Sequence, residues 1–165
     1  MPRQFSPRAQ CGRPGDAEFG HLGTGIPSAI GAKLARPDVD VFCISGDGAA
    51  GFNIMEMETA VRENVKITVI VHAEGSWAME EIVHIAEGAD PERYRSALFG
   101  TVRWDKIAEA VGCHGEYVEK SADLVPAMQR ARDSELPALV CVKTDRQATL
   151  IPPGLEQFGE VYSGA

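Results

Sequence analysis

Two acidic residues each follow an apolar run that has the length and composition of a buried strand. Asp47 lies in the Gly46-Asp47-Gly48 segment after the run 41–45, and Glu74 follows the run 65–71. If these runs are neighbouring parallel strands, both carboxylates lie at the carboxyl edge of one sheet, where open α/β sheets bind ligands. Carboxylates beside glycine-rich turns with free backbone N–H groups suit Mg²⁺ or Ca²⁺ carrying a phosphorylated ligand. The sequence therefore predicts a cation and phosphate site at this edge.

The elements that would position these residues alternate between strand and helix. Apolar runs predict strands at 41–45, 65–71, 115–118 and 137–142, and helical patterns lie between Pro27 and Pro37, over about 53–64, near 80–85, after Asp105 and around Pro126. Continuous rather than alternating apolar runs indicate a parallel sheet that is covered on both faces. The predicted fold class is α/β, a three-layer sandwich with a mostly parallel sheet and helices on both faces. The pattern leaves the strand order open.

Periodicity and capping preferences also assign individual side chains. Ile30 and Leu34 are expected to face inward from the first helix. Asp105 is expected to cap the N-terminus of the helix that follows it, because a carboxylate there accepts from free backbone N–H groups. Glu80 and Glu81 are expected on a solvated helix face.

Bulk composition limits the class of protein. The 165 residues suit one domain, with 44% apolar and 24% charged residues as in ordinary globular proteins. A formal charge of −8 without a Lys/Arg cluster argues against a nucleic-acid surface. The four cysteines are widely spaced and form no CxxC pair, so Cys43 and Cys141 are expected to be small buried hydrophobes. No membrane span or signal-peptide pattern is present, and a cytoplasmic protein is expected.

Composition also divides the chain. Residues 1–18 are rich in Pro, Gly and Arg, and are expected to be a flexible arm or linker. Residues 19–148 are expected to form the domain, and residues 149–165 an extended C-terminal tail.

The chain from Phe19 to Asp145 resembles the diphosphate-binding (PP) domain of thiamine-diphosphate-dependent enzymes. The likeness is to the branch that contains acetolactate synthase and benzoylformate decarboxylase. It rests on the order and spacing of residues 19–35, Gly46-Asp47-Gly48, residues 56–62 and the Gly75-Ser76-Trp77 loop. A GDG tripeptide alone is typical of any tight turn; the whole succession is far more specific.

The resemblance implies roles for particular residues. Asp47, Glu74 and the carbonyl of Ser76 correspond to the metal ligands, with Mg²⁺ as the ion. Leu22 corresponds to the apolar residue that props thiamine diphosphate into its bent conformation, and His21 is a possible contact to substrate or cofactor. No catalytic residue is assigned with certainty. The full set of implied cofactor contacts is His21, Leu22, Gly46, Asp47, Gly48, Ala49, Ala50, Glu74, Gly75, Ser76, Trp77 and Ala78.

The sequence departs from the family in two respects. Where the family usually has Asn-Asn, this chain has Ala73-Glu74, which adds a negative charge beside the diphosphate. The family's pyrimidine-binding (PYR) domain, whose glutamate protonates the cofactor's N1′, does not fit in 165 residues. The chain is therefore expected to be half of a site, either a small subunit or part of a longer enzyme. Its partner would be a PYR-domain subunit or the N-terminal part of the same enzyme, in a homo- or hetero-oligomer.

The predicted function is to bind the diphosphate of thiamine diphosphate through Mg²⁺. The chain would do so as the PP domain or small subunit of a 2-oxo-acid decarboxylase or carboligase, with a small 2-oxo acid as substrate. One alternative is a non-catalytic homologue with weakened cofactor binding that serves as a dimerisation or regulatory module. Another is a flavodoxin-like nucleotide or phosphate binder, since a fold alone does not fix function.

Overall fold

The computed structural model describes residues 21–86 and 88–146, with the side chain of residue 86 left aside. The expected arm at 1–18 and the expected tail at 149–165 lie outside the described residues. No described helix combines the length and apolar character needed to cross a bilayer.

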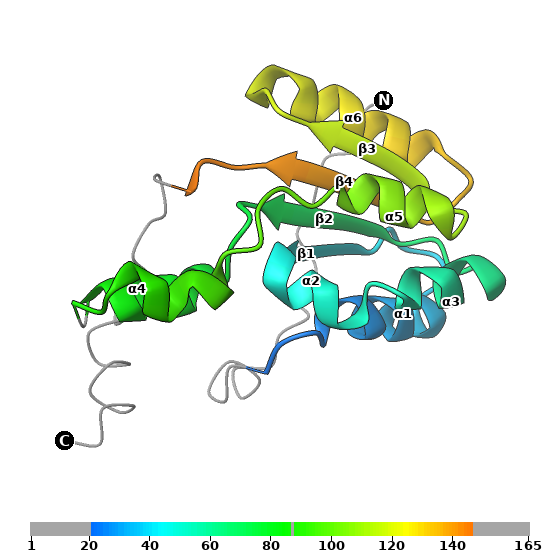
Figure 1. Cartoon of the computed structure of the whole chain (residues 1–165). Helices are drawn as coiled ribbons and strands as arrows, with labels where there is room; N and C mark the ends of the chain where they lie inside the picture. The colour runs from blue at the N-terminus through cyan, green and yellow to red at the C-terminus, as the bar shows by residue number, and fades with distance from the viewer. Residues whose placement is uncertain (1–20, 87, 147–165) are drawn as a thin grey trace.

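A sheet of four parallel strands forms the centre of the fold, in the order β1-β2-β4-β3 (Figure 1). The strands are β1 (Phe42–Gly46), β2 (Thr68–Ala73), β3 (His114–Val118) and β4 (Ala138–Lys143). All four overlap the predicted runs, and β2 begins three residues later than expected. Val65 and Ile67 are buried ahead of it, so apolar character extends beyond the paired backbone.

Helices cover both faces of this sheet. The first core cluster joins β2 residues Val69 and Val71 to side chains from α1, α2, α3 and α5. The second joins Val118 of β3 to Ala127 and Ala131 of α6 on the opposite face. The helices are α1 (Gly25–Ala35), α2 (Asp47–Asn53), α3 (Glu56–Arg62), α4 (Ala78–Ala86), α5 (Trp104–Ala110) and α6 (Ser121–Asp133), with a 3₁₀ segment η1 (Pro91–Ala97).

Strand β4 shows how the layers arise from sequence. Leu139 and Cys141 pack into the first cluster, and Ala138 and Val140 into the second. Side chains alternate across a strand, so a continuous apolar run buries both faces. The predicted α/β three-layer fold is confirmed. Figure 1 shows α6 on one side of the sheet, α1 and α3 on the other, and α4 beyond the carboxyl ends of the strands.

One expectation about a side chain was wrong. Leu34 is 63% exposed, and the inward side chains of α1 are Ile26, Ala29 and Ile30. The helix expected over about 53–64 is present as α3, and a further helix that was not predicted, α2, begins directly at Asp47. The early start of α2 places the Gly46-Asp47-Gly48 segment on a helix N-terminus.

The described cysteines behave as small hydrophobes. Cys43, Cys113 and Cys141 are buried and form no disulfide, as expected for the first and last of them. Burial raises the pKa of the Cys113 thiol to about 11, so that thiol stays protonated at neutral pH.

Candidate functional site

Asp47 and the residues after β2 lie at the same edge of the sheet. Gly46, the last residue of β1, pairs with His72 in the parallel register of β1 and β2. Asp47 therefore follows β1 at the level at which Ala73 and Glu74 follow the paired part of β2. The structure thus brings together the two segments from which the sequence predicted a site.

Asp47 is a buried carboxylate held by backbone N–H groups. It is 1% exposed and is the first residue of α2. Its Oδ1 accepts a hydrogen bond of 2.9 Å from the N–H of Gly48, and its Oδ2 accepts one of 2.7 Å from Gly75. These bonds and the positive end of the helix dipole stabilise a negative charge that burial alone would disfavour. Each carboxylate oxygen keeps a further lone pair for a ligand.

Gly75 joins this carboxylate to a third segment of chain. Its φ of +80° lies in the left-handed region, and a Cβ there would stand 2.7 Å from the carbonyl oxygen of Gly100. Its own carbonyl accepts bonds of 3.0 Å from the N–H groups of Phe99 and Gly100. Only glycine satisfies both the conformation and this close approach. The Asp47 loop, the Gly75 loop and the segment at 99–100 are therefore locked together.

Ser76 and Glu74 occupy the other two positions assigned to metal ligands. Ser76 is 2% exposed, and no N–H of the described residues donates to its carbonyl oxygen. Glu74 is half-buried, and its charge helps to raise the pKa of Arg146. No group of three or more His, Cys, Asp or Glu side chains gathers around a point within the described residues. A cation at Asp47 would therefore rely on main-chain oxygens as well as carboxylates.

The expectation that Glu81 lies on a solvated helix face was wrong. Its side chain on α4 is 10% exposed and forms a two-pronged ion pair with Arg146, one hydrogen bond of which measures 2.8 Å. This contact holds the pKa of Glu81 below its usual range. Glu80 is exposed, as expected. The ion pair joins α4 to the segment after β4, beside Glu74.

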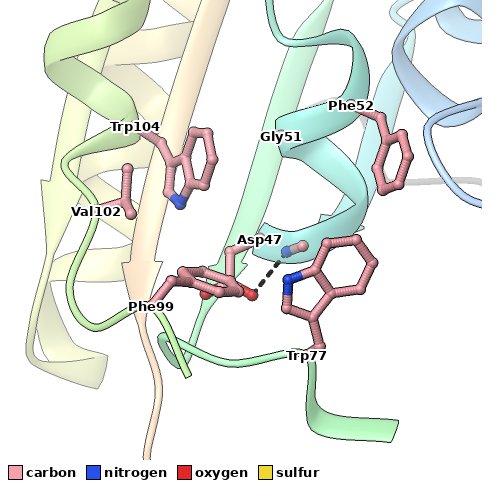
Figure 2. Close-up of a pocket in the computed structure, with 8 residues that line it drawn as sticks. Asp47, Gly51, Phe52, Trp77, Phe99, Val102 and Trp104 are labelled. Atoms are coloured by element: carbon pink, nitrogen blue, oxygen red, sulfur yellow. Dashed lines mark hydrogen bonds between the residues drawn. The ribbon is translucent and has the colours of Figure 1, made fainter. Parts of the chain in front are cut away.

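A cavity of about 470 Å³ opens between α2 and α5 next to Asp47 (Figure 2). The rings of Phe52 and Trp77 pack edge to face, with their centroids 5.5 Å apart. A Cβ on Gly48 would lie 3.4 Å from the Trp77 ring, and one on Gly51 would lie 3.2 Å from Trp104. The glycines of α2 therefore let both indoles approach the helix closely. The lining residues are Asp47, Gly48, Gly51, Phe52, Trp77, Phe99, Val102 and Trp104.

An ion pair that was not predicted from the sequence holds Trp104 and the start of α5 in place. Asp105 does not cap α5, whose N-cap is Arg103. Asp105 is 2% exposed and accepts hydrogen bonds of 2.8 and 2.6 Å from the Arg103 guanidinium. The guanidinium also lies 4.1 Å from the centre of the Tyr117 ring. These contacts raise the pKa of Arg103 and fix the start of α5 against β3.

The remaining predicted site residues surround α2. Leu22 is 42% exposed and His21 is exposed, so neither is held by the core. The adjoining Gly23 carbonyl accepts a bond of 2.9 Å from Nδ2 of Asn53, which fixes this loop beside α2. Ala49 is half-buried and Ala50 is 1% exposed, both in the first turn of α2. Ala78 begins α4 directly after Trp77.

Comparison with known proteins identifies one family and several similar enzymes. The family model described as "Thiamine pyrophosphate enzyme, C-terminal TPP binding domain" matches residues 4–142. The chain is 42% identical over 127 residues to a probable acetolactate synthase of Mycobacterium bovis, covering 77% of this chain and 23% of that protein. It is 33% identical over 118 residues to a sulfoacetaldehyde acetyltransferase of Alcaligenes xylosoxydans xylosoxydans, covering 72% of this chain and 19% of that protein.

A solved structure shares the fold. It is the thiamine diphosphate-dependent 4-hydroxybenzoylformate decarboxylase of Rhodococcus jostii RHA1, with a TM-score of 0.69 and 27% identity. The match covers 77% of this chain and 24% of that one. The chain thus spans less than a quarter of the length of these relatives.

Proposed function

Because the chain belongs to the C-terminal TPP-binding domain family of thiamine pyrophosphate enzymes, we propose that it holds the diphosphate of thiamine diphosphate through Mg²⁺. The observation that carries the proposal is the Asp47 carboxylate, buried at the shared edge of β1 and β2 and oriented by the N–H groups of Gly48 and Gly75. Oxygen ligands of this kind suit Mg²⁺, which keeps some of its own waters and takes substrate phosphates.

The residues at this edge of the sheet fit a Mg²⁺ ion with a bound diphosphate. The first N–H groups of a helix have no partner within it. The N–H of Gly48 is taken by Asp47, and that of Ala50 makes the first intrahelical bond to the N-cap carbonyl of Gly46, which leaves Ala49 available to an anion. The open carbonyl of Ser76 and the carboxylates of Asp47 and Glu74 would hold the ion. We call the N–H groups of Ala49, Ser76 and Ala78 the diphosphate cradle, because those of Gly75 and Trp77 already donate to Asp47 and to the Ala97 carbonyl. Leu22 would prop the bent cofactor and His21 would contact it from the exposed loop.

In this proposal the role of the protein is to bind the cofactor and to orient it. The bound cofactor supplies the thiazolium that stabilises a carbanion. Asp47 would hold the metal in a fixed direction, because its two backbone hydrogen bonds prevent rotation of the carboxylate. Gly75 places the loop that carries Glu74 and Ser76 against Asp47, so the ligands are preorganised by the fold.

The proposed whole enzyme is a 2-oxo-acid decarboxylase or carboligase of the acetolactate-synthase type. The chain would serve as its PP domain or small subunit, in an oligomer with a PYR domain that completes the site, and act on a small 2-oxo acid. A cytoplasmic location accompanies this proposal. The proposed domain spans residues 19–148, between the arm at 1–18 and the tail at 149–165.

One observation favours a second candidate. Glu74 places a negative charge where the diphosphate would lie, and a like-charge contact at ~4 Å and an effective dielectric near 20 costs on the order of 4 kcal/mol before compensation. A non-catalytic homologue with weakened cofactor binding, serving dimerisation or regulation, would tolerate that cost. The nearby charge of Arg146 offsets part of it, which favours the cofactor-binding proposal.

Calorimetric titration with thiamine diphosphate and Mg²⁺ separates the two candidates. We expect metal-dependent binding by the wild-type chain and its loss in Asp47→Ala. Asp38→Ala is the matched control, since Asp38 pairs with Arg36 on the exposed surface. Circular dichroism confirms that each variant is folded. Absence of binding at millimolar ligand, with and without a PYR-domain partner, would refute the proposal, as would unchanged binding by folded Asp47→Ala.

A further inference from the structure

The aromatic cavity contains a hydrogen-bond donor that has no acceptor. Trp104 is 7% exposed, and its indole Nε1 is buried without a partner among the described residues. In Figure 2 the nitrogen-bearing edge of this ring is turned toward Phe99 and Asp47. A buried N–H without an acceptor has lost its hydrogen bonds to water without replacement, so such groups in folded proteins normally have a partner. A ligand in the cavity would supply the missing acceptor.

The side chains that line the cavity favour a flat, apolar ligand. Phe52, Trp77, Phe99 and Trp104 supply four aromatic rings, and Val102 adds an aliphatic side chain. Contacts between aromatic rings stabilise a complex beyond the effect of the apolar area that they bury. A volume of about 470 Å³ lies within the range of small-molecule sites, roughly 300 to 1,000 Å³. An aromatic ring fits this space.

In the metal-free chain, the charge of the lining disfavours an anion. Asp47 is the one ionisable residue among the lining residues, and none of them is Lys, Arg or His. A carboxylate or phosphate on the ligand would therefore meet a like charge in a partly dehydrated cavity. An ammonium group would not satisfy Trp104 either, because it has no lone pair to accept the Nε1–H. A neutral acceptor is the group that satisfies Trp104.

We propose that this cavity binds a neutral aromatic carbonyl compound, whose ring lies among Trp77, Phe99 and Trp104 and whose carbonyl oxygen accepts the Trp104 Nε1–H. The ligand contacts aromatic side chains, whereas the diphosphate cradle consists of main-chain N–H groups, and the cavity shares Asp47 with the proposed metal site. The cavity extends from Asp47 toward α5 and needs neither metal nor diphosphate.

The walls are fixed before any ligand arrives. The Arg103–Asp105 ion pair and the Tyr117 ring hold the first turn of α5, which carries Trp104. The N–H of Phe99 bonds to the Gly75 carbonyl at 3.0 Å. A preformed pocket binds without the cost of ordering its walls.

Nuclear magnetic resonance can test this site directly, because the sequence contains two tryptophans and both line the cavity. The indole N–H signals of the ¹⁵N-labelled chain are assigned with Trp77→Phe and Trp104→Phe. The probe is acetophenone, added in EDTA without thiamine diphosphate. We expect the Trp104 indole signal to move with saturation, and Trp104→Phe to weaken binding about tenfold because it keeps a ring and loses the donor. Trp77→Phe is the matched control and should change affinity less.

Two further probes in the wild-type chain keep the test independent of how the variants fold. Ethylbenzene has nearly the same shape as acetophenone without the acceptor, and should bind about tenfold more weakly. Equal binding of the two, or tighter binding of phenyltrimethylammonium, would overturn the proposal, as would a Trp104 signal that stays in place at saturating acetophenone. Because metal and cofactor are absent, failure here leaves the calorimetric test of the diphosphate cradle unaffected.

Discussion

The backbone N–H of Gly75 donates to Oδ2 of Asp47 at 2.7 Å, which ties the end of β1 to the loop after β2. The two residues are 28 positions apart in the chain. Because the Gly75 carbonyl also accepts from Phe99 and Gly100, one glycine sets both the direction of the carboxylate and the position of the cavity wall. The proposed metal site and the aromatic cavity therefore share one structural support.

Gly75→Ala should remove this support. The backbone φ of +80° is strained for alanine, and the new Cβ would stand 2.7 Å from the Gly100 oxygen. Together these effects should lower the free energy of unfolding by about 2 to 3 kcal/mol, measured by urea denaturation.

Gly31→Ala is the matched control for this substitution. Gly31 lies on the exposed side of α1, and a Cβ there meets nothing within 4 Å. Alanine is the better helix former, so the variant should be more stable by roughly 0.5 to 1 kcal/mol. Equal stability of the two variants would contradict the structural role of Gly75.

The strands and their common edge could be predicted because they depend on local sequence. Continuous apolar runs such as 137–142 and 65–71 identify buried parallel strands, and parallel strands end at one edge. That reasoning was enough to place Asp47 and Glu74 in neighbouring segments. It did not give the strand order, which depends on contacts between distant parts of the chain.

The cavity wall could not be predicted for the same reason. Nothing local distinguishes Phe99 or Trp104 as lining residues, since their position depends on how the segment before α5 meets Gly75. Glu81 matched an exposed helix face by periodicity, but its partner Arg146 lies 65 residues further along. Asp105 precedes apolar residues as a cap would, yet the neighbouring guanidinium binds it more strongly than free N–H groups do.

Arg103→Ala should be strongly destabilising. It leaves the Asp105 carboxylate, 2% exposed, without its counter-ion. Because a buried carboxylate loses its partner, the free energy of unfolding should fall clearly, although the half-exposed position of Arg103 lets water replace part of the contact; urea denaturation would measure the loss. Arg62→Ala is the control, because Arg62 pairs with Glu58 and Glu63 on the exposed surface and should cost under about 1 kcal/mol. Similar losses in both variants would show that Asp105 does not depend on Arg103.

Glu81→Gln should change how stability depends on pH. Arg146 lowers the pKa of Glu81 from its ordinary value near 4.5 in the folded state. A lowered folded pKa stabilises the protein above the unfolded value, and this contribution is lost as pH falls through the folded pKa. The variant should be less stable than wild type by about 1 to 2 kcal/mol at pH 7, and the difference should shrink below about pH 4.5.

Urea titrations at several pH values would measure this difference, with Glu80→Gln as control. Glu80 is the neighbouring residue on α4 and is exposed, so its variant should follow the wild-type curve. A constant gap between Glu81→Gln and wild type from pH 7 to pH 3 would contradict the ion-pair explanation.

Glu74→Asn should tighten the metal-dependent binding of thiamine diphosphate. Asparagine keeps an oxygen that can ligate Mg²⁺ and removes the negative charge that faces the diphosphate. The full like-charge cost, on the order of 4 kcal/mol, is reduced by the metal and by Arg146, so a gain of about tenfold in affinity is expected. Calorimetry at fixed Mg²⁺ measures it, with Glu80→Asn as the control for loss of one charge away from the edge of the sheet. Weaker binding by Glu74→Asn would mean that the carboxylate itself is needed at this position, because an amide oxygen would then be an insufficient ligand.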